Sequence, residues 1–276
     1  MTDTTSRIIT SPSGVFHLDA KEIFKYRELL YTFVWRDIKV RYKQTALGVA
    51  WAVFQPLTSM VVFSIFFGNL AKVPSDGIPY PVFVFSGLLF WNYFSTALTN
   101  CSNSLIDNES IIKKIYFPRL ILPVAAVGTP IVDFLVSWTI LFFMMLFYDF
   151  RISFFSILVT PGLLILSAVS ALGIGTFLAA VNSRYRDVRY ILPFFIQLLL
   201  FITPVIYPVG IVPESLKWIL FINPMTAVVE ISRSLLFGGM HPNMALISIS
   251  IISSIFLFVS GVFYFKKTES YLADLL

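Results

Sequence analysis

Residues 154–182 read "FFSILVTPGLLILSAVSALGIGTFLAAVN", a run without one charged side chain. A membrane-spanning helix needs about 20 mostly apolar residues, so this run is long enough to cross a bilayer. Small side chains recur in it every four residues, which predicts a ridge for close packing against another helix. These small residues are Ser167, Ala171, Gly175 and Ala179.

Five further runs of similar length and composition extend this pattern along the chain. They lie at about 49–71, 81–105, 120–148, 190–208 and 244–265, and Asp133 is the one formal charge within the six runs. Hydrophobic residues make up 57% of the 276 residues, and the mean hydropathy is +0.84. A soluble domain is about 45–50% apolar, so we expect an all-α integral membrane protein with six transmembrane helices.

The distribution of positive charge predicts the orientation of these spans. Most Lys and Arg residues fall in the N-terminal tail, in 107–119, in 183–189 or after 265. Cytoplasmic segments carry such an excess, so these segments and both termini are predicted to be cytoplasmic. The basic residues on the other side are Lys72, Arg151, Lys217 and Arg233.

The expected domain organisation follows from the spans. A cytoplasmic tail with an amphipathic interface helix occupies 1–48, a transmembrane domain occupies 49–265, and a cytoplasmic C-terminal tail occupies 266–276. No second soluble domain has room between them.

Several classes of protein are disfavoured by composition. The single cysteine, Cys101, excludes an internal disulfide, and His17 and His241 lie far apart without a Cys or acidic cluster, so we expect no metal site. The net charge of +5 is not gathered on one soluble face, which argues against nucleic acid. No glycine is followed by lysine, so the chain has no phosphate-binding loop and uphill transport would need an outside source of energy.

The charged segment "DNESIIKKIYFPR" (107–119) predicts a short cytoplasmic helix over 107–118. In this prediction Asp107 caps the helix, Glu109 pairs with Lys113, and Pro118 ends it. Its apolar residues would share one face, either as a connector lying on lipid headgroups or as a knob that docks on a cytoplasmic partner. The candidate docking residues are Asp107, Glu109, Ile111, Ile112, Lys113, Lys114, Ile115 and Tyr116.

A basic amphipathic helix is predicted over 21–45, in the cytoplasmic interface of the membrane. Its polar stripe comprises Lys21, Lys25, Glu28, Thr32, Arg36, Lys39 and Lys43, and its apolar stripe comprises Ile23, Leu30, Val34 and Ile38. Arg27 and Arg41 interrupt the apolar side, where each needs an anion such as a lipid phosphate or a substrate pyrophosphate. A plain membrane anchor is the simpler alternative.

Aromatic and polar side chains alternate at helical spacing in the first and fifth runs. Rings could stack on sugars while amides and hydroxyls bind sugar hydroxyls, so these stripes are candidate channel linings. Ordinary bundle core or an interfacial aromatic belt is the alternative. The stripes are Trp51, Gln55, Thr58, Val62 and Phe66 in the first run, and Tyr190, Phe194, Gln197 and Phe201 in the fifth.

Asp133 is a functional candidate because an ionisable group inside a membrane is costly. The alternative is a structural Asp that hydrogen-bonds to Thr129 or Ser137 nearby.

The apolar external stretch 209–240 predicts a re-entrant pair of short helices within 213–237. We expect Pro213 to begin the first helix and Asn223-Pro224 to begin the second, and Gly238-Gly239 to end it. The hairpin would be an outer gate or a static cap.

Three blocks of the sequence resemble the permease subunits of type-2 ABC exporters, most closely the Wzm-type O-antigen and surface-polysaccharide permeases, with teichoic-acid permeases as relatives. They are "WRDIKVRYKQTALGVAWAVFQPL" (35–57), "IIKKIYFPRLILPVAAVGTPIVDFL" (111–135) and "SRYRDVRYILPFFIQLLLFITPVIYP" (183–208). Arg36, Lys39 and Arg41 match basic positions of the interface helix of that family, and Asp133 matches an acid that it often carries.

The resemblance implies a function in the bacterial inner membrane. Two permeases and two copies of a separate ATP-binding subunit would form the transporter, with ATP and magnesium held by the partner. Segment 107–118 would be the coupling helix, 213–237 the external re-entrant helices, and the first and fifth spans would line a channel for a polyprenyl-pyrophosphate-linked polysaccharide. The alternatives are a proton-coupled secondary transporter that uses Asp133, or a membrane enzyme acting on polyprenyl-linked glycans.

Overall fold

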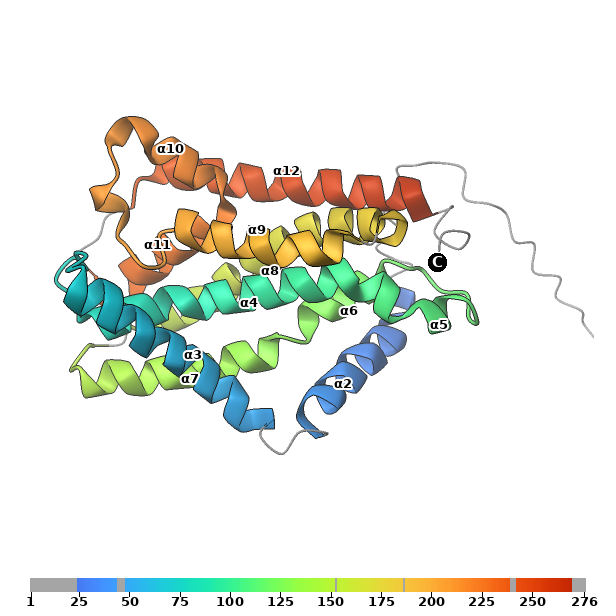
Figure 1. Ribbon diagram of the computed structural model, residues 1–276, viewed down its shortest axis with the longest axis horizontal. Coiled ribbons are helices and arrows are strands. Elements are labelled where there is room, and N and C mark those ends of the chain that lie inside the picture. Colours follow the sequence, from blue (N-terminus) through green and yellow to red (C-terminus); the bar gives the residue numbers. More distant parts are fainter. Residues whose placement is uncertain (1–23, 44–47, 152, 186, 239–241, 270–276) are drawn as a thin grey trace, which may run out of the picture.

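The computed structural model describes residues 24–43, 48–151, 153–185, 187–238 and 242–269, and every regular element in these ranges is a helix (Figure 1). The longest helices lie side by side and make a bundle. Helix α10 (Glu214–Ile222) lies at one end of the bundle, and α5 (Glu109–Ile112) lies at the other end.

Five helical segments are long and apolar enough to cross a membrane, and they match the first, second, third, fourth and sixth predicted spans. They are α3 (Gly48–Phe63) continued by the π-helix η1 (Ser64–Leu70), α4 (Tyr80–Asp107), α6 (Ile121–Gly128) with α7 (Ile131–Phe147), α8 (Phe154–Arg184) and α12 (Met244–Glu269). The expected all-helical membrane fold is therefore confirmed, with five to six candidate spans.

The predicted fifth span is shorter than the sequence suggested. Helix α9 covers only Val188–Ile202, whereas the apolar run was expected to continue to residue 208. At about 1.5 Å per residue its 15 residues rise about 22 Å, less than the hydrocarbon thickness of about 30 Å. The helix ends because Thr203, which precedes Pro204, is extended (φ −73°, ψ 135°), as a residue before proline prefers.

The two short helices predicted within 213–237 are present. Helix α10 and helix α11 (Pro224–Phe237) meet at an angle of 109°, so the pair is either a broken span or a re-entrant loop. The side chain of Asn223 caps α11 by accepting a hydrogen bond from the amide of Met225 at 3.0 Å, with Pro224 in the first turn. Gly238 follows α11 with φ +69°, a conformation that favours glycine.

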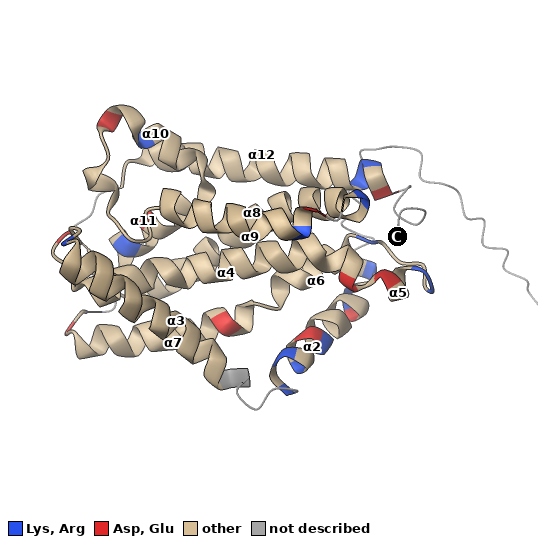
Figure 2. Ribbon diagram, viewed as in Figure 1, with Lys and Arg blue, Asp and Glu red and all other residues tan. Residues whose placement is uncertain are grey.

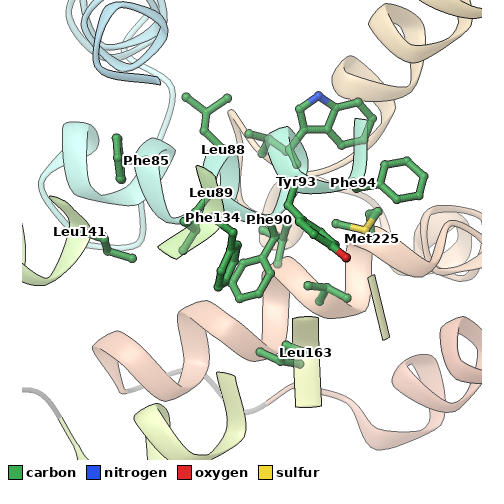
Figure 3. Packing of buried hydrophobic residues seen from close by; sticks show 14 of the residues in the cluster. Phe85, Leu88, Leu89, Phe90, Tyr93, Phe94, Phe134, Leu141, Leu163 and Met225 are labelled. Carbon is green, nitrogen blue, oxygen red and sulfur yellow. The ribbon is translucent and has the colours of Figure 1, made fainter. Parts of the chain in front are cut away.

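Helix α4 forms the centre of the bundle. It contacts α3, α6, α7, α8, α9 and α11, and it has more buried residues than any other described helix. Figure 3 shows the aromatic part of this core, in which Phe134 of α7 lies against Phe90 and Tyr93 of α4, at ring-centroid distances of 5.2 and 5.9 Å. Aromatic rings at such distances attract one another beyond their simple burial.

The small-residue ridge of α8 brings that helix close to α4, as predicted. Ser167, Ala171 and Ala179 are fully buried, and a Cβ atom added to Gly175 would lie 2.5 Å from Sγ of Cys101 in α4. The neighbouring face of α8 meets α12, where the hydroxyls of Ser170 and Ser254 are 2.8 Å apart. Small side chains allow this approach, which gains dispersion contacts between helices in lipid.

We predict that Gly173→Ala destabilises the fold. A Cβ at this position would lie 2.6 Å from the backbone of Phe258 in α12, and backbone atoms cannot swing aside. The free energy of unfolding should fall by about 1–3 kcal/mol, measured as a lower thermal midpoint of the detergent-solubilised protein. Gly162→Ala is the matched control in the same helix, because nothing lies within 4 Å of its Cβ position. Equal midpoints for the two variants would contradict the packing argument.

Candidate functional site

Charged residues gather at one end of the bundle, around α2 (Arg27–Lys43), α5 and the end of α12 (Figure 2). The middle parts of α4, α8, α9 and α12 carry none. This distribution agrees with a cytoplasmic end and an apolar belt, as the positive-charge pattern predicted.

The predicted helix over 107–118 is wrong in its bounds. Asp107 is the last residue of α4, and Asn108, not Asp107, is the N-cap of α5, which ends at Ile112 after a single turn. Lys113 and Lys114 form a turn, and residues 115–118 are irregular well before Pro118. The pair between Glu109 and Lys113 is confirmed at 2.6 Å.

The predicted single apolar face of this segment is also wrong, because its residues divide into two groups. Ile112 is buried and belongs to a core cluster with Phe33 and Phe117, and Ile111 packs against that cluster. Ile115 and Tyr116 are 62% and 84% exposed. The early loss of the helix turns these two residues outward, so they are the apolar residues that a partner could reach.

Helix α2 lies against the bundle by an apolar face centred on Phe33, which is buried, with Leu29, Leu30 and Val34 packed around it. The predicted polar stripe is not entirely solvent-facing. Nη2 of Arg36 donates to Oδ1 of Asn108 at 2.8 Å, and the guanidinium also pairs with Asp37. The amide of Asn108 donates in turn to the carbonyl of Ser104 in α4 at 2.8 Å, so α2 is bonded to the residue that precedes α5.

The anion that meets Arg41 is a carboxylate of this chain. Nη2 of Arg41 lies 2.6 Å from Oδ2 of Asp133, and the hydroxyl of Tyr42 donates to Oδ1 of Asp133. Burial and the bond to Asp133 raise the pKa of Tyr42 above its usual value, so this phenol remains protonated as a donor. The local partners expected for Asp133 were wrong, since the hydroxyl of Thr129 donates to the carbonyl of Ala125 at 3.2 Å. Sequence spacing missed the pair because 92 positions separate Arg41 from Asp133.

The other two basic residues predicted for the lipid interface are exposed on α2. The guanidinium of Arg27 lies 4.9 Å from the ring centre of Phe24, and the ammonium of Lys39 lies 5.1 Å from that of Trp35. Such cation–aromatic contacts leave the charge accessible to phosphate groups.

Both aromatic stripes lie on exposed faces. All nine stripe residues are exposed, including Trp51 at 55% and Tyr190 at 80%. Helices α3 and α9 both contact α4 with their other faces. The stripes are therefore no part of this chain's core, and the channel and the aromatic belt remain as interpretations.

Arg233 is a residue that the sequence reading counted only as an external charge. It lies in α11 and is 1% exposed. Nη1 donates to the carbonyl of Pro204 at 2.6 Å, while Nη2 donates to those of Val205 at 2.6 Å and Phe83 at 3.1 Å. The carbonyls of Pro204 and Val205 belong to the non-helical segment after α9. Arg233 therefore satisfies backbone acceptors that have no helical partner once α9 has ended.

Glycine at position 87 makes room for this arginine. A Cβ there would lie 2.9 Å from Nη2 of Arg233 and 3.2 Å from Cα of Val205. Arg233 thus connects α11, α4 and the end of α9.

Among the residues that the structure describes, no group of three or more His, Cys, Asp or Glu side chains could hold a metal ion.

We predict that Arg233→Met loosens the external hairpin. The loss of the guanidinium leaves buried carbonyls without their donor, at about 1–3 kcal/mol for each. The thermal midpoint should fall, and hydrogen exchange should rise selectively in 203–206 and 224–237. Arg151→Met removes an exposed charge and is the control. A fall in stability without selective exchange would contradict the anchoring role.

Comparisons with known proteins agree on the family of this chain. Residues 28–237 match the family model described as ABC-2 type transporter. The chain is 30% identical over 249 residues to an O-antigen export system permease protein RfbA of Klebsiella pneumoniae, covering 90% of this chain and 95% of that protein. A protein of the same name from Myxococcus xanthus is 26% identical over 91% of this chain and 96% of its own length.

A more distant relative is the polysialic acid transport protein KpsM of Escherichia coli, 23% identical over 87% of this chain and 93% of that protein. The chain belongs to the ABC-2 type transporter family. It is a multi-pass membrane permease, a transport subunit without an ATPase domain of its own.

Proposed function

We propose that this member of the ABC-2 type transporter family is the membrane permease of an ATP-driven exporter that moves a polyprenyl-pyrophosphate-linked, O-antigen-type polysaccharide across the bacterial inner membrane. The names of its relatives support this cargo, because they export O-antigen or transport polysialic acid. The observation that carries the proposal is the pair of exposed aromatic and polar stripes on α3 and α9.

These stripes suit a glycan path between two copies of the chain. Trp51 and Phe194 present ring faces on which sugars can stack, while Gln55 and Gln197 offer amide donors and acceptors. Neither stripe is covered by another described part of the same chain. A homodimer that brings α3 of one copy towards α9 of the other would close these faces into a channel.

The topology that we propose completes six crossings. Helix α9 with the non-helical segment 203–208 makes the sixth crossing, and α10 with α11 makes an external re-entrant hairpin. Both termini then lie in the cytoplasm, as the positive charge favours. Non-helical backbone at this depth needs partners within the protein, and Arg233 supplies two of them.

ATP hydrolysis would come from two copies of a separate ATP-binding subunit, which holds ATP and magnesium. The exposed pair Ile115 and Tyr116, beside Lys113 and Lys114, is the surface on which we place the docking contact. An aromatic residue flanked by apolar and basic neighbours fits the centre of a protein interface.

Movement at the docking segment can reach the membrane through α2. The Arg36–Asn108 bond ties α2 to the start of α5, and the Arg41–Asp133 pair ties the same helix to α7. Because α2 is one continuous helix over Arg27–Lys43, we expect a displacement of Asn108 to shift Asp133 as well. We therefore treat Arg36, Arg41, Asn108 and Asp133 as positioning residues for transport.

Family membership favours this function over the two alternatives. A proton-coupled transporter would need Asp133 to load and release protons, yet this carboxylate is held by Arg41 and Tyr42. The enzyme alternative depended on acids at the membrane surface, where Asp107 pairs with Arg189 at 3.3 Å and Glu109 pairs with Lys113.

The proposed function is tested by deleting the gene in its host and locating the lipid-linked glycan. We expect surface polysaccharide to disappear while finished polymer accumulates on the cytoplasmic side, and the wild-type gene to restore export. Absence of finished polymer anywhere would place the block in synthesis and overturn the proposal. Export that persists after ATP depletion at a constant proton gradient would show that ATP hydrolysis does not drive transport.

We predict that Ile115→Asp with Tyr116→Asp uncouples export. Two charges in an apolar docking contact should lower surface polysaccharide at least about tenfold and reduce copurification of the ATP-binding subunit. Tyr185→Asp, at an exposed aromatic position of another cytoplasmic segment, is the control. Ile112 is unsuitable because it is buried, and its replacement would disturb folding. Normal export by the double variant would refute the docking surface.

We predict that Trp51→Ala with Phe194→Ala slows glycan export at least about 5-fold, since each ring loses a stacking contact of about 0.5–1.5 kcal/mol. The matched control is Phe54→Ala with Phe195→Ala, which removes two exposed rings of the same helices outside the stripes. Export is measured as the rate at which labelled polymer reaches the surface. If both double variants slowed export equally, the stripes would be interpreted as a lipid-facing aromatic belt.

A further inference from the structure

A cavity of about 590 Å³ lies where α2, α3, α4 and α7 meet, away from α9 and from the docking segment. Its volume falls within the range of about 300–1,000 Å³ that is usual for sites of small ligands. Its walls include Trp51, Leu89 and Phe134, while Arg41 and Asp133 also line it.

Three polar side chains in this cavity have no hydrogen-bond partner among the residues that the structure describes. Gln55, Asn92 and Thr96 line it, and none of their side chains makes a hydrogen bond to another residue that the structure describes. Gln55 and Asn92 lie on helices long and apolar enough to span a membrane, where an unpaired amide is costly. An occupant with hydrogen-bonding groups of its own would remove that cost.

The charges of the cavity are one cation and one anion side by side. Arg41 and Asp133 are 2.6 Å apart, and both line the cavity. A guanidinium has five N–H donors and a carboxylate has about four acceptor sites, so both groups can bind a ligand while they remain paired. Such a site suits a ligand that carries both signs of charge.

The depth of the cavity is that of lipid headgroups. Arg41 lies in the last turn of the basic helix α2, and Trp51 lies near the start of the apolar helix α3. Tryptophan is enriched at this boundary of the membrane, where one side is apolar and the other is wet. The remaining surface of α3 and α7 carries exposed apolar residues such as Phe54 and Leu135, along which acyl chains can lie.

We infer that this cavity binds the headgroup of a zwitterionic phospholipid of the phosphatidylethanolamine type. In this site the ammonium donates to the carboxylate of Asp133, the phosphate accepts from Arg41, and Gln55, Asn92 and Thr96 bind the ester and glycerol oxygens. A pyrophosphate fits less well, because its second negative charge meets Asp133 at short range. Trp51 and Gln55 belong both to the wall of this cavity and to the α3 stripe, so the site borders the glycan path of the proposed function.

The test uses the full-length protein in detergent, titrated with phosphatidylethanolamine or phosphatidylglycerol of identical chains, and counts bound lipids by native mass spectrometry. The net charge of +5 favours the anionic lipid in general, so a preference for the zwitterionic lipid must come from a specific site. We expect phosphatidylethanolamine to bind at least about tenfold more tightly, which corresponds to one hydrogen bond to a charged group.

Three variants separate the roles of the residues. Asp133→Asn should abolish the preference, and Asn92→Leu, which fills the cavity wall with an apolar group, should weaken binding without lowering the thermal midpoint in lipid-free detergent. Asp149→Asn changes an acid at the other end of α7 that does not line the cavity, and it should behave as the wild type.

Other results would overturn the inference. Equal binding of the two lipids, or unchanged binding by Asn92→Leu, would exclude a headgroup site. Tighter binding of a polyprenyl pyrophosphate at this cavity would assign it to the exported substrate instead. If Asn92→Leu left lipid binding intact but altered dimer formation, a second copy of the chain would be the occupant. None of these results affects the gene-deletion test, so the two proposals fail separately.

Discussion

A polar group at membrane depth must find its partner within the protein, and this constraint explains the main features of the structure. Helix α9 stops at Ile202, and the carbonyls of Pro204 and Val205 would then face an apolar environment. Arg233 reaches both, and the absence of a side chain at Gly87 leaves the space that the guanidinium fills. The external hairpin is held in place because its arginine is the donor that this broken helix requires.

The same constraint acts at the end of the bundle where the charged residues gather (Figure 2). Asp133 lies in the first turn of α7, inside a segment long and apolar enough to span the membrane. Its carboxylate is satisfied by Arg41 and Tyr42, which come from α2. Burial of the Asp133 carboxylate costs free energy unless it is paired, and its pairing with α2 fixes the position of that helix. The sequence alone predicted only that α2 lies on the membrane surface. With the Arg36–Asn108 bond, this contact makes α2 the connection between the start of α5 and α7.

The helices pack closely against one another with one face each, and some of their other faces remain exposed. We propose that two of these exposed faces form the glycan path. Helix α4 has more buried residues than any other described helix, because several helices contact it and α8 approaches it along a ridge of small residues. Helices α3 and α9 border the same core with one face each, and their aromatic stripes stay exposed. The exposure of these two aromatic stripes agrees with the channel that we propose between two copies of the chain.

The sequence by itself determined the fold class, five of the six expected spans and the caps of the external helices. These depend on local properties: the length of apolar runs, the spacing of small residues, and the preferences of Asn223, Pro224 and Gly238. Tertiary structure decided what depends on partners far apart in the chain. The pairing of Arg41 with Asp133 and the burial of Arg233 join residues that no periodic pattern connects. Tertiary packing also explains why Ile112 is buried while Tyr116 is exposed. Ile112 packs with Phe33 and Phe117, and the short helix ends earlier than its own sequence predicts.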